Sequence, residues 1–219
     1  MRPQPDVRPE LKGPQFAAWI FFVFSYITGV FSATIAGLIA LGLGVIRKGG
    51  MPSANQAYLQ SIVLDENVQL LGFLGVASSA GSLSLICWGP IFIHAACVCV
   101  WIANDQSHVT GLYSKLIALV QKTGLIAKLS ANQAHMWTLR HDLEVYMGLY
   151  LTFGIFIGLS SILTTLLYWQ IMRMRYLMSP ACQQAYVRFD AAASQKLASR
   201  WCPGVFSIIY IKIRSFLKG

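Results

Sequence analysis

The strongest constraint on this chain is the spacing of its charged residues. Three long intervals contain no Asp, Glu, Lys or Arg; they run from Lys12 to Arg47, from Glu66 to Asp105, and from Glu144 to Arg173. The hydrocarbon core of a bilayer is about 30 Å thick, and a helix of about 20 apolar residues crosses it. Each interval is therefore long enough to span a membrane.

The amino-acid composition supports a membrane protein. Apolar residues make up 56% of the chain and charged residues only 11%, whereas a soluble domain has about a quarter of its residues charged. Backbone amides in lipid must be hydrogen-bonded within the protein, so only helices and closed barrels span a membrane. Runs this long favour helices over the roughly ten-residue alternating strands of a barrel. The sequence predicts an all-α integral membrane protein.

The predicted organisation has about four transmembrane helices with interfacial amphipathic helices. A cytosolic N-terminal tail at 1–15 precedes a membrane domain at 16–178 and a basic amphipathic tail at 179–219. Within the membrane domain we expect spans at 16–46, 68–80, 83–103 and 145–172, and an amphipathic loop at 112–142. The segment 77–84 consists mostly of residues with small side chains and contains a glycine, which predicts a turn between the middle two spans. Because 68–80 is short for a complete crossing, a re-entrant hairpin is the alternative there.

The positive charges predict which side of the membrane each segment occupies. The chain after 172 carries eight Lys and Arg residues against one acidic residue, which places the C-terminus in the cytosol by the positive-inside rule. Four crossings then place the N-terminus in the cytosol and the loops at 47–66 and 105–144 in the lumen. The second loop carries four basic residues, which argues against a lumenal position. A hairpin that only dips into the membrane would put more of the basic segments on the cytosolic side.

The pentapeptide SANQA occurs twice, beginning at Ser53 and again at Ser130. Each copy precedes an apolar interval, and a serine in that position can cap the N-terminus of a helix. We therefore expect a short helix in each copy that brings acidic residues to the membrane interface. The acidic pairs are Asp65 with Glu66 and Asp142 with Glu144. The repeat predicts architecture rather than catalysis.

The basic tail is predicted to form two helices. Ser179 and Pro180 suit an N-cap and a first helical position, and the residues 201–204 break the pattern. A strand at 209–214 is the weaker interpretation, because a lone strand at a chain end has no partner. On the helix after 204, apolar residues gather on one side, although Ile208 and Ile211 fall on the polar side.

A basic amphipathic helix lies in the headgroup layer of a membrane, because its apolar face is buried and its cations attract anionic lipid. The predicted membrane-binding residues are Phe189, Trp201, Val205, Phe206, Ile209, Tyr210, Ile213, Phe216 and Leu217. The residues predicted to contact anionic lipid or a partner are Arg173, Arg175, Arg188, Lys196, Arg200, Lys212, Arg214 and Lys218. The alternative is that the tail packs on the protein's own membrane bundle or on a partner subunit.

The sequence does not favour catalysis, and we predict no cofactor and no metal. His94 and Cys97 share one helix face, but a metal site needs further ligands and no companion cluster lies in the other spans. Four histidines are too few for a membrane di-iron oxidase. The net charge of +9 lies next to the apolar intervals and lacks a nucleic-acid-binding module, so anionic lipid is the expected partner. A transporter is disfavoured because ionisable groups are nearly absent at membrane depth.

Several motifs carry a resemblance to a known family. They are SANQAYLQSIVLDENV from Ser53, IFIHAACVCVWIAND from Ile91, KLSANQAHMW from Lys128 and LLYWQIMRMRY from Leu166. Together with the basic tail they resemble the transmembrane protein 33 family, which includes the Krüppel-homolog-2 type proteins and pore-membrane nucleoporins, over most of 50–219.

The resemblance implies a multi-pass protein of the endoplasmic reticulum membrane and nuclear envelope. It further implies that the protein shapes or stabilises curved membrane as a non-enzymatic scaffold with reticulon-like or nuclear pore membrane proteins, with a role in nuclear pore assembly in some members. A homo- or hetero-oligomer is compatible with this expectation. The alternative function is that of an accessory structural subunit of a larger membrane protein complex.

Overall fold

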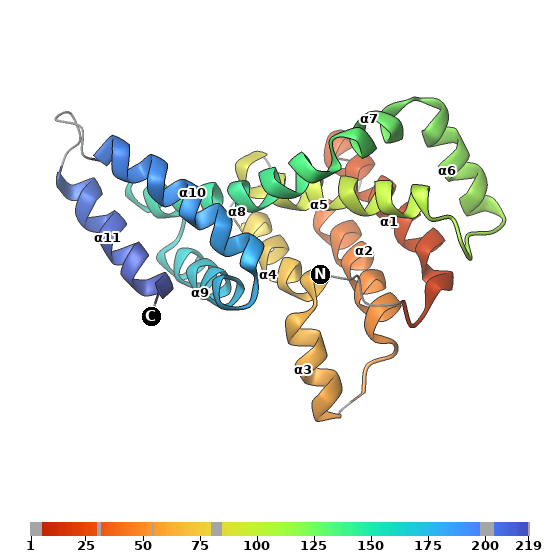
Figure 1. Ribbon diagram of the computed structural model, residues 1–219, viewed down its shortest axis with the longest axis horizontal. Helices are drawn as coiled ribbons and strands as arrows, with labels where there is room; N and C mark the ends of the chain where they lie inside the picture. Colours follow the sequence, from red (N-terminus) through yellow and green to blue (C-terminus); the bar gives the residue numbers. More distant parts are fainter. Residues whose placement is uncertain (1–5, 30–31, 54, 80–84, 198–203, 219) are drawn as a thin grey trace. The chain divides into compact units, whose positions relative to one another are not determined.

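The computed structural model describes residues 6–29, 32–53, 55–79, 85–197 and 204–218. Every regular element within these ranges is a helix, which confirms the all-α prediction. The chain forms two compact units, Met1–Trp137 and Thr138–Gly219, which are described one at a time. Figure 1 colours the helices along the chain.

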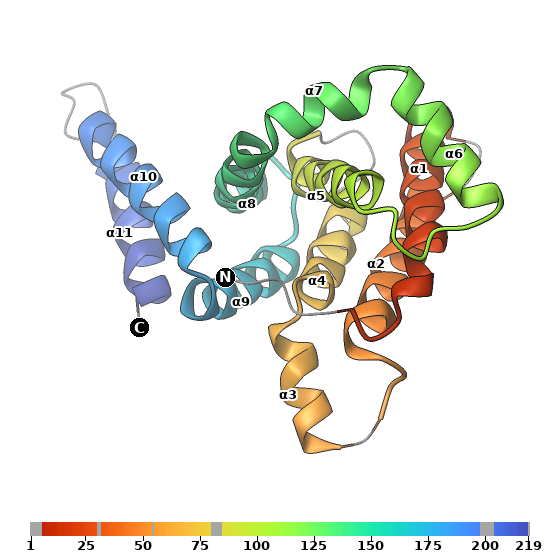
Figure 2. The same cartoon turned by 45° about the vertical axis from the view of Figure 1, so that its right-hand side comes forward.

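The first unit contains a short 3-10 helix and seven α-helices before helix α8 begins. Their bounds are η1 Pro9–Leu11, α1 Lys12–Thr28, α2 Ala33–Gly49, α3 Gln56–Leu64, α4 Glu66–Ser79, α5 Leu85–Asn104, α6 Leu112–Lys122 and α7 Leu125–Ala131. Helices α1 and α2 lie side by side in both ribbon views (Figure 2). The second unit contains most of α8 Gln133–Phe156, then α9 Ile162–Met178, α10 Pro180–Leu197 and α11 Gly204–Lys218.

The first charge-free interval is not one helix. Helix α1 ends at Gly29, which has a φ of +65° and whose amide donates to the carbonyl of Ser25 at 2.9 Å. A residue in this left-handed conformation terminates a helix, and glycine adopts it without steric cost. The chain then reverses into α2, where a Cβ added to Gly37 would stand 3.4 Å from the Phe22 ring of α1. The segment 16–46, predicted as a single span, is therefore a helical hairpin.

The middle interval holds α4 and α5. Residues 77–79 of the predicted turn complete α4, and residues 80–84 lie outside the described residues. Of the helices that the structure describes, only α5, over 86–104, is both long and apolar enough to cross a membrane by itself. The prediction of four complete spans is therefore not supported by the helix lengths.

The third interval is also divided. Helix α8 ends at Phe156, Gly158 has a φ of +73°, and α9 begins at Ile162. The Ser161 hydroxyl accepts a hydrogen bond from the Thr164 amide at 3.0 Å, which caps α9. The segment 145–172, predicted as one span, is thus two helices joined by a short turn.

The two SANQA copies start helices at the same position, although not by the predicted device. Helix α3 begins at Gln56 and α8 begins at Gln133, the fourth residue of each copy. The predicted serine caps are wrong: Ser130 lies within α7, where its hydroxyl accepts from Asn104 Nδ2 at 3.1 Å, and Ser53 lies three residues before α3. The acidic pairs also differ, because the first stands where α4 begins and the second lies inside α8.

The tail forms the two predicted helices. Helix α10 begins at Pro180, and the Ser179 hydroxyl accepts from the Cys182 amide at 3.4 Å. The last segment is helix α11 rather than a strand. In the amphipathic loop, Gly124 has a φ of +71° and separates α6 from α7.

Two glycines of α2 provide a test of the packing in the first unit. An added Cβ at Gly44 would stand 2.6 Å from Gln15 Nε2 and 2.7 Å from Asn67 Oδ1, whereas a Cβ at Gly42 would meet nothing within 4 Å. We expect Gly44→Ala to destabilise the protein by about 1–3 kcal/mol through overpacking. Thermal melting of the purified protein in detergent measures the effect. The control Gly42→Ala should be neutral or slightly stabilising, because alanine favours a helix, and equal melting temperatures for the two variants would contradict the described packing.

Candidate functional site

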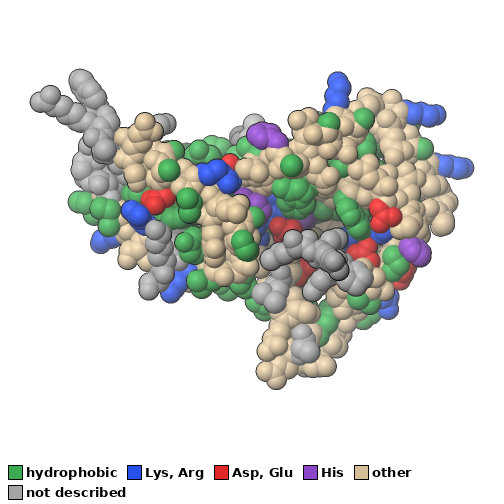
Figure 3. All heavy atoms as spheres, in the orientation of Figure 1, with side chains coloured by type: hydrophobic (Ala, Val, Ile, Leu, Met, Phe, Trp, Pro, Cys, Tyr) green, Lys and Arg blue, Asp and Glu red, His purple; other side chains and the backbone are tan. Residues whose placement is uncertain are grey.

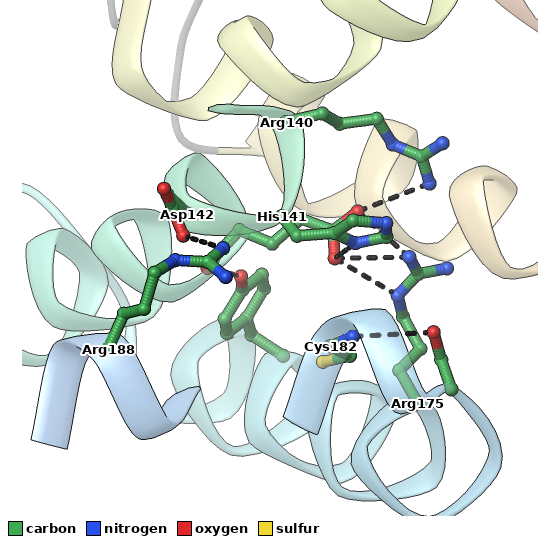
Figure 4. Close-up of polar contacts among 9 residues, drawn as sticks. Arg140, His141, Asp142, Arg175, Cys182 and Arg188 are labelled. Carbon is green, nitrogen blue, oxygen red and sulfur yellow. Dashed lines mark hydrogen bonds and ion pairs between the residues drawn. The ribbon is translucent and has the colours of Figure 1, made fainter. Parts of the chain in front are cut away.

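The second unit is built around a buried carboxylate, Glu144 of α8, which is 0% exposed. Arg175 of α9 approaches it with two nitrogens: Nη2 lies 2.9 Å from Oε1, and Nε lies 3.2 Å from Oε2. Arg140, one turn earlier on α8, places its Nη2 3.2 Å from Oε1. Both arginine side chains are fully or almost fully buried, and Figure 4 shows them converging from different helices.

Two further side chains complete this ion cluster. The Nδ1 atom of His141 lies 3.3 Å from Glu144 Oε2. The Tyr168 hydroxyl donates to the backbone carbonyl of Glu144, which adds a second connection between α8 and α9. The cluster therefore fixes the register between the middle of α8 and the last turn of α9.

The charges of the cluster determine its chemistry. Burial raises the pKa of Glu144, but the neighbouring Arg175 and Arg140 charges and the His141 contact outweigh it, and the pKa lies below its ordinary value. Burial also raises the pKa of the nearby Cys182 thiol to about 12, so this thiol is not a nucleophile at neutral pH. The residues that the structure describes contain no group of three His, Cys, Asp or Glu side chains that could hold a metal ion. The ion pairs and the Tyr168 hydrogen bond of the cluster connect α8 to α9.

The tail packs on the second unit through residues that were predicted to bind lipid. Tyr210 of α11 is buried, and its hydroxyl donates to Asp190 of α10. The Tyr210 and Phe189 rings lie 6.0 Å apart between centroids, and Phe189 also meets Tyr146 of α8 at 6.0 Å. Ring contacts at these distances stabilise packed helices. Tyr210 of the expected lipid face therefore points toward α10, and Phe189 of α10 points toward α8.

The next turn of α11 follows the same pattern. Ile213 and Phe216 are half-buried, and the Arg173 guanidinium of α9 lies 5.2 Å from the Phe216 ring, a cation–π contact. The remaining predicted membrane-binding side chains lie outside what the structure describes: Trp201, Val205, Phe206, Ile209 and Leu217.

The opposite face of α11 is exposed and mixed in character. Ile208 and Ile211 are each 59% exposed, and Lys212 and Ser215 are exposed beside them. These positions follow the i, i+3, i+4, i+7 spacing of one helix face. Sequence reasoning assigned the two isoleucines to the polar side, but their spacing was the signal that marks an outward apolar stripe.

The predicted cation contacts differ in their surroundings. Arg173, which contacts the Phe216 ring, is half-buried. Arg175 is buried in the ion cluster and is not available to lipid. Arg188 and Arg214 are exposed and paired, the first with Asp142 at 2.6 Å and the second with Asp190 at 3.2 Å. Lys212 is exposed on the outward face of α11. The side chains of Lys196, Arg200 and Lys218 lie outside the described residues.

Comparison with known proteins gives a consistent result. A family model described as Transmembrane protein 33/Nucleoporin POM33 matches residues 15–219. A Dictyostelium discoideum protein named Transmembrane protein 33 homolog is 23% identical over 224 residues, which cover 99% of this chain and 74% of that protein. No solved structure matches the chain.

The ion cluster predicts a large effect of one substitution. Glu144→Gln keeps the size of the side chain but leaves two buried arginines without their counter-charge, and we expect a loss of about 3–5 kcal/mol of stability. Asp142→Asn, two residues away, removes only the exposed pair with Arg188, which we expect to cost at most about 1 kcal/mol. Melting in detergent compares the two, and equal losses would show that the cluster does not stabilise the unit.

The lowered pKa of Glu144 also predicts a dependence on pH. A carboxyl whose pKa is lower in the folded state stabilises the fold fully above its ordinary value of 4.5 and loses that contribution as the pH falls through the folded value. The difference in melting temperature between the native protein and Glu144→Gln should therefore be constant near neutral pH and shrink in strongly acidic buffer. A difference that grows on acidification would contradict an ionised Glu144.

Proposed function

We propose that this chain, which belongs to the Transmembrane protein 33/Nucleoporin POM33 family, is a non-enzymatic membrane protein of the endoplasmic reticulum and nuclear envelope that stabilises curved membrane and scaffolds partner proteins. The family description names both a transmembrane protein and a nucleoporin. It supports a place in the membrane next to nuclear pores, and a role in their assembly. The proposed protein partners are reticulon-like or nuclear pore membrane proteins, bound in a homo- or hetero-oligomer.

The observation that carries the proposal is the exposed face of α11. Ile208 and Ile211 point outward next to Lys212, on a helix whose other face is attached to the second unit. Burying an isoleucine in lipid stabilises binding by about 1.5–3 kcal/mol, and a lysine near anionic headgroups adds about 1 kcal/mol. This face therefore suits the boundary between headgroups and acyl chains.

The attachment of α11 gives this surface a fixed orientation. Asp190 of α10 accepts from the Tyr210 hydroxyl and pairs with Arg214, so two residues on successive turns of α11 are tied to one carboxylate. A helix held in this way loses less conformational entropy on binding than a free tail would. Figure 3 shows Lys, Arg and apolar side chains interspersed over α10 and α11.

A second candidate function is an accessory subunit of a larger membrane complex. A shallow surface groove on α10 favours it, because the groove joins an apolar side chain, Val187 at 62% exposure, to the guanidinium of Arg188. The other residues that line the groove are Pro180, Gln183 and Gln184. Purifying the protein from membranes without dissociating its complexes separates the two candidate functions. A stoichiometric complex in which a partner covers α10 would support the accessory subunit.

The membrane-shaping proposal predicts the effect of adding charge to the α11 face. The full-length double variant Ile208→Asp/Ile211→Asp replaces both exposed isoleucines with carboxylates, which removes about 3–6 kcal/mol of apolar burial in lipid and adds repulsion from anionic headgroups. We expect proteoliposomes containing phosphatidylserine to be smaller or more tubular with the native protein than with this variant. Electron cryomicroscopy at a fixed protein-to-lipid ratio measures their diameters.

The control for this experiment is Ser215→Asp, which adds a carboxylate to the same face and removes no apolar side chain. It should retain most of the effect on vesicle diameter. Native-like diameters with the double variant would overturn the role of the α11 face.

A further inference from the structure

In the first unit, the charged residues that flank the two charge-free intervals gather at one end of the helices. Lys12, where α1 begins, places its Nζ 2.7 Å from Asp105, which follows α5. Lys48, near the end of α2, lies 3.8 Å from Asp65, which precedes α4. The hydrogen bonds from Lys12 and Ser107 lower the pKa of Asp105 to about 2, so the first pair stays ionised. We call this end the base of the first unit.

The opposite ends of the same helices also meet one another. Tyr26 near the end of α1 lies 5.3 Å from Trp88 near the start of α5, between ring centroids. The Thr34 hydroxyl near the start of α2 lies 2.8 Å from the Ser78 hydroxyl near the end of α4. We call this end the tip.

Between the base and the tip, α1 stays in contact with α5 and α2 stays in contact with α4. Trp19 meets His94 at 5.7 Å near the middle of α1 and α5. On α2 and α4, a Cβ at Gly37 would lie 3.1 Å from Leu74, between the Thr34–Ser78 contact and the Lys48–Asp65 pair. Helices α1 and α5 are therefore antiparallel, as are α2 and α4. The chain enters at the base, turns at the tip and returns to the base twice, through α1–α2 and through α4–α5.

The surface toward the tip is apolar and exposed. No Asp, Glu, Lys or Arg lies between Lys12 and Arg47 or between Glu66 and Asp105. Exposed apolar side chains cover α1 and α2 instead; they include Phe24 at 54%, Ile27 at 75%, Ile35 at 46%, Leu38 at 47% and Ile39 at 50%. An exposed patch of this kind requires a partner, and its lack of charge fits the acyl chains of a bilayer.

The second unit contains a hairpin of the same design. Helices α8 and α9 are joined at one end by Glu144 and Arg175, and further along the Trp169 indole nitrogen donates to the Thr152 hydroxyl at 3.0 Å. Beyond that contact, apolar side chains are exposed at the ends of both helices and in the turn between them: Phe156 at 71%, Ile157 at 70%, Ile162 at 64% and Leu163 at 68%.

The lengths of these helices decide how deep the hairpins reach. Helices α1, α2 and α9 have 17 residues each and α4 has 14, which correspond to about 26 Å and about 21 Å at 1.5 Å per residue. A hydrocarbon core of about 30 Å is thicker than either length. Helix α5, with 20 residues, matches the core at about 30 Å, but its hairpin partner α4 is shorter. A hairpin that has one helix this short, and whose base stays among the headgroups, therefore ends inside the membrane.

We propose that all three hairpins enter the membrane from the cytosolic side and end within it, so that the segments around 6–12, 47–66, 105–144 and 173–218 share the cytosolic face. The segment 105–144 carries Lys115, Lys122, Lys128 and Arg140, and the positive-inside rule places such a segment in the cytosol. The name of this side rests on the proposed residence in the endoplasmic reticulum. A hairpin that stops short of the far leaflet displaces more lipid in the near one, which supplies a physical cause for curvature.

Cysteine labelling of the full-length protein tests the proposal. Single cysteines are introduced at the base by Met51→Cys and Thr110→Cys, and at the tips by Ile27→Cys and Ile157→Cys, in a Cys202→Ser background. All four positions are exposed, and the native Cys87, Cys97, Cys99 and Cys182 are buried. Cells with a permeabilised plasma membrane and an intact endoplasmic reticulum are treated with a membrane-impermeant maleimide, before and after the reticulum is opened.

The expected result is full labelling of both base cysteines while the reticulum is intact, and no labelling of the tip cysteines under either condition. A base cysteine that reacts only after the reticulum is opened would overturn entry from one side. A tip cysteine that reacts once the lumen is opened would show that the hairpin crosses the membrane, which also overturns the proposal. Neither outcome depends on vesicle diameter, so failure of this topology and failure of the curvature function are distinguishable.

Discussion

The structure depends on the cost of placing charge in hydrocarbon. Each of the three charge-free intervals folds back on itself, and each returns its charged flanks to a common end, where opposite charges pair. Lys12 with Asp105 and Glu144 with Arg175 are the clearest cases. Pairing compensates the charges at the ends of the hairpins, which reduces the cost of placing them next to hydrocarbon.

The two units use this pairing differently. In the first unit the pair of Lys12 with Asp105 is partly exposed, because Asp105 retains 48% of its side-chain surface. In the second unit Glu144 is buried between two arginines and holds α9 in place on α8. The end of α9 in turn positions the start of α10. A fixed α11 presents Ile208 and Ile211 outward, so the surface proposed to bind lipid is held in place by an ion cluster that touches no lipid itself.

The sequence was sufficient to predict the helical class, the charge-free intervals and both tail helices with the start at Pro180. It was not sufficient to show that two of the predicted spans are hairpins. Gly29 and Gly158 each adopt a left-handed conformation inside a long apolar run, but glycine is common within membrane helices, so neither residue marks a turn by itself. The reversals become visible only through contacts across each hairpin, such as those of Phe22 with Gly37 and of Glu144 with Arg175.

The tail illustrates a second limit of sequence reasoning. A helical wheel identifies an apolar face, yet it cannot say whether that face meets lipid or protein. Tyr210 and Phe216 were assigned to lipid, whereas Phe189 and Arg173 of the same unit contact them. Arg175 was counted among the lipid-contacting cations because nothing in the sequence indicates that Glu144, 31 positions earlier, is its partner.

The closure of the first unit has a consequence for how relatives compare with this chain. Asp6 reaches Arg47 at 3.4 Å, and the Arg8 amide donates to the Arg47 carbonyl at 2.9 Å, so residues 6–12 form a strap across the hairpin ends. The family match begins only at residue 15, after the strap and after Lys12. In a homologue whose residues before this point differ, the charges equivalent to Arg47 and Asp105 must therefore be balanced by some other group. Exchanging this N-terminal segment between homologues would change the strap and leave the helices unchanged.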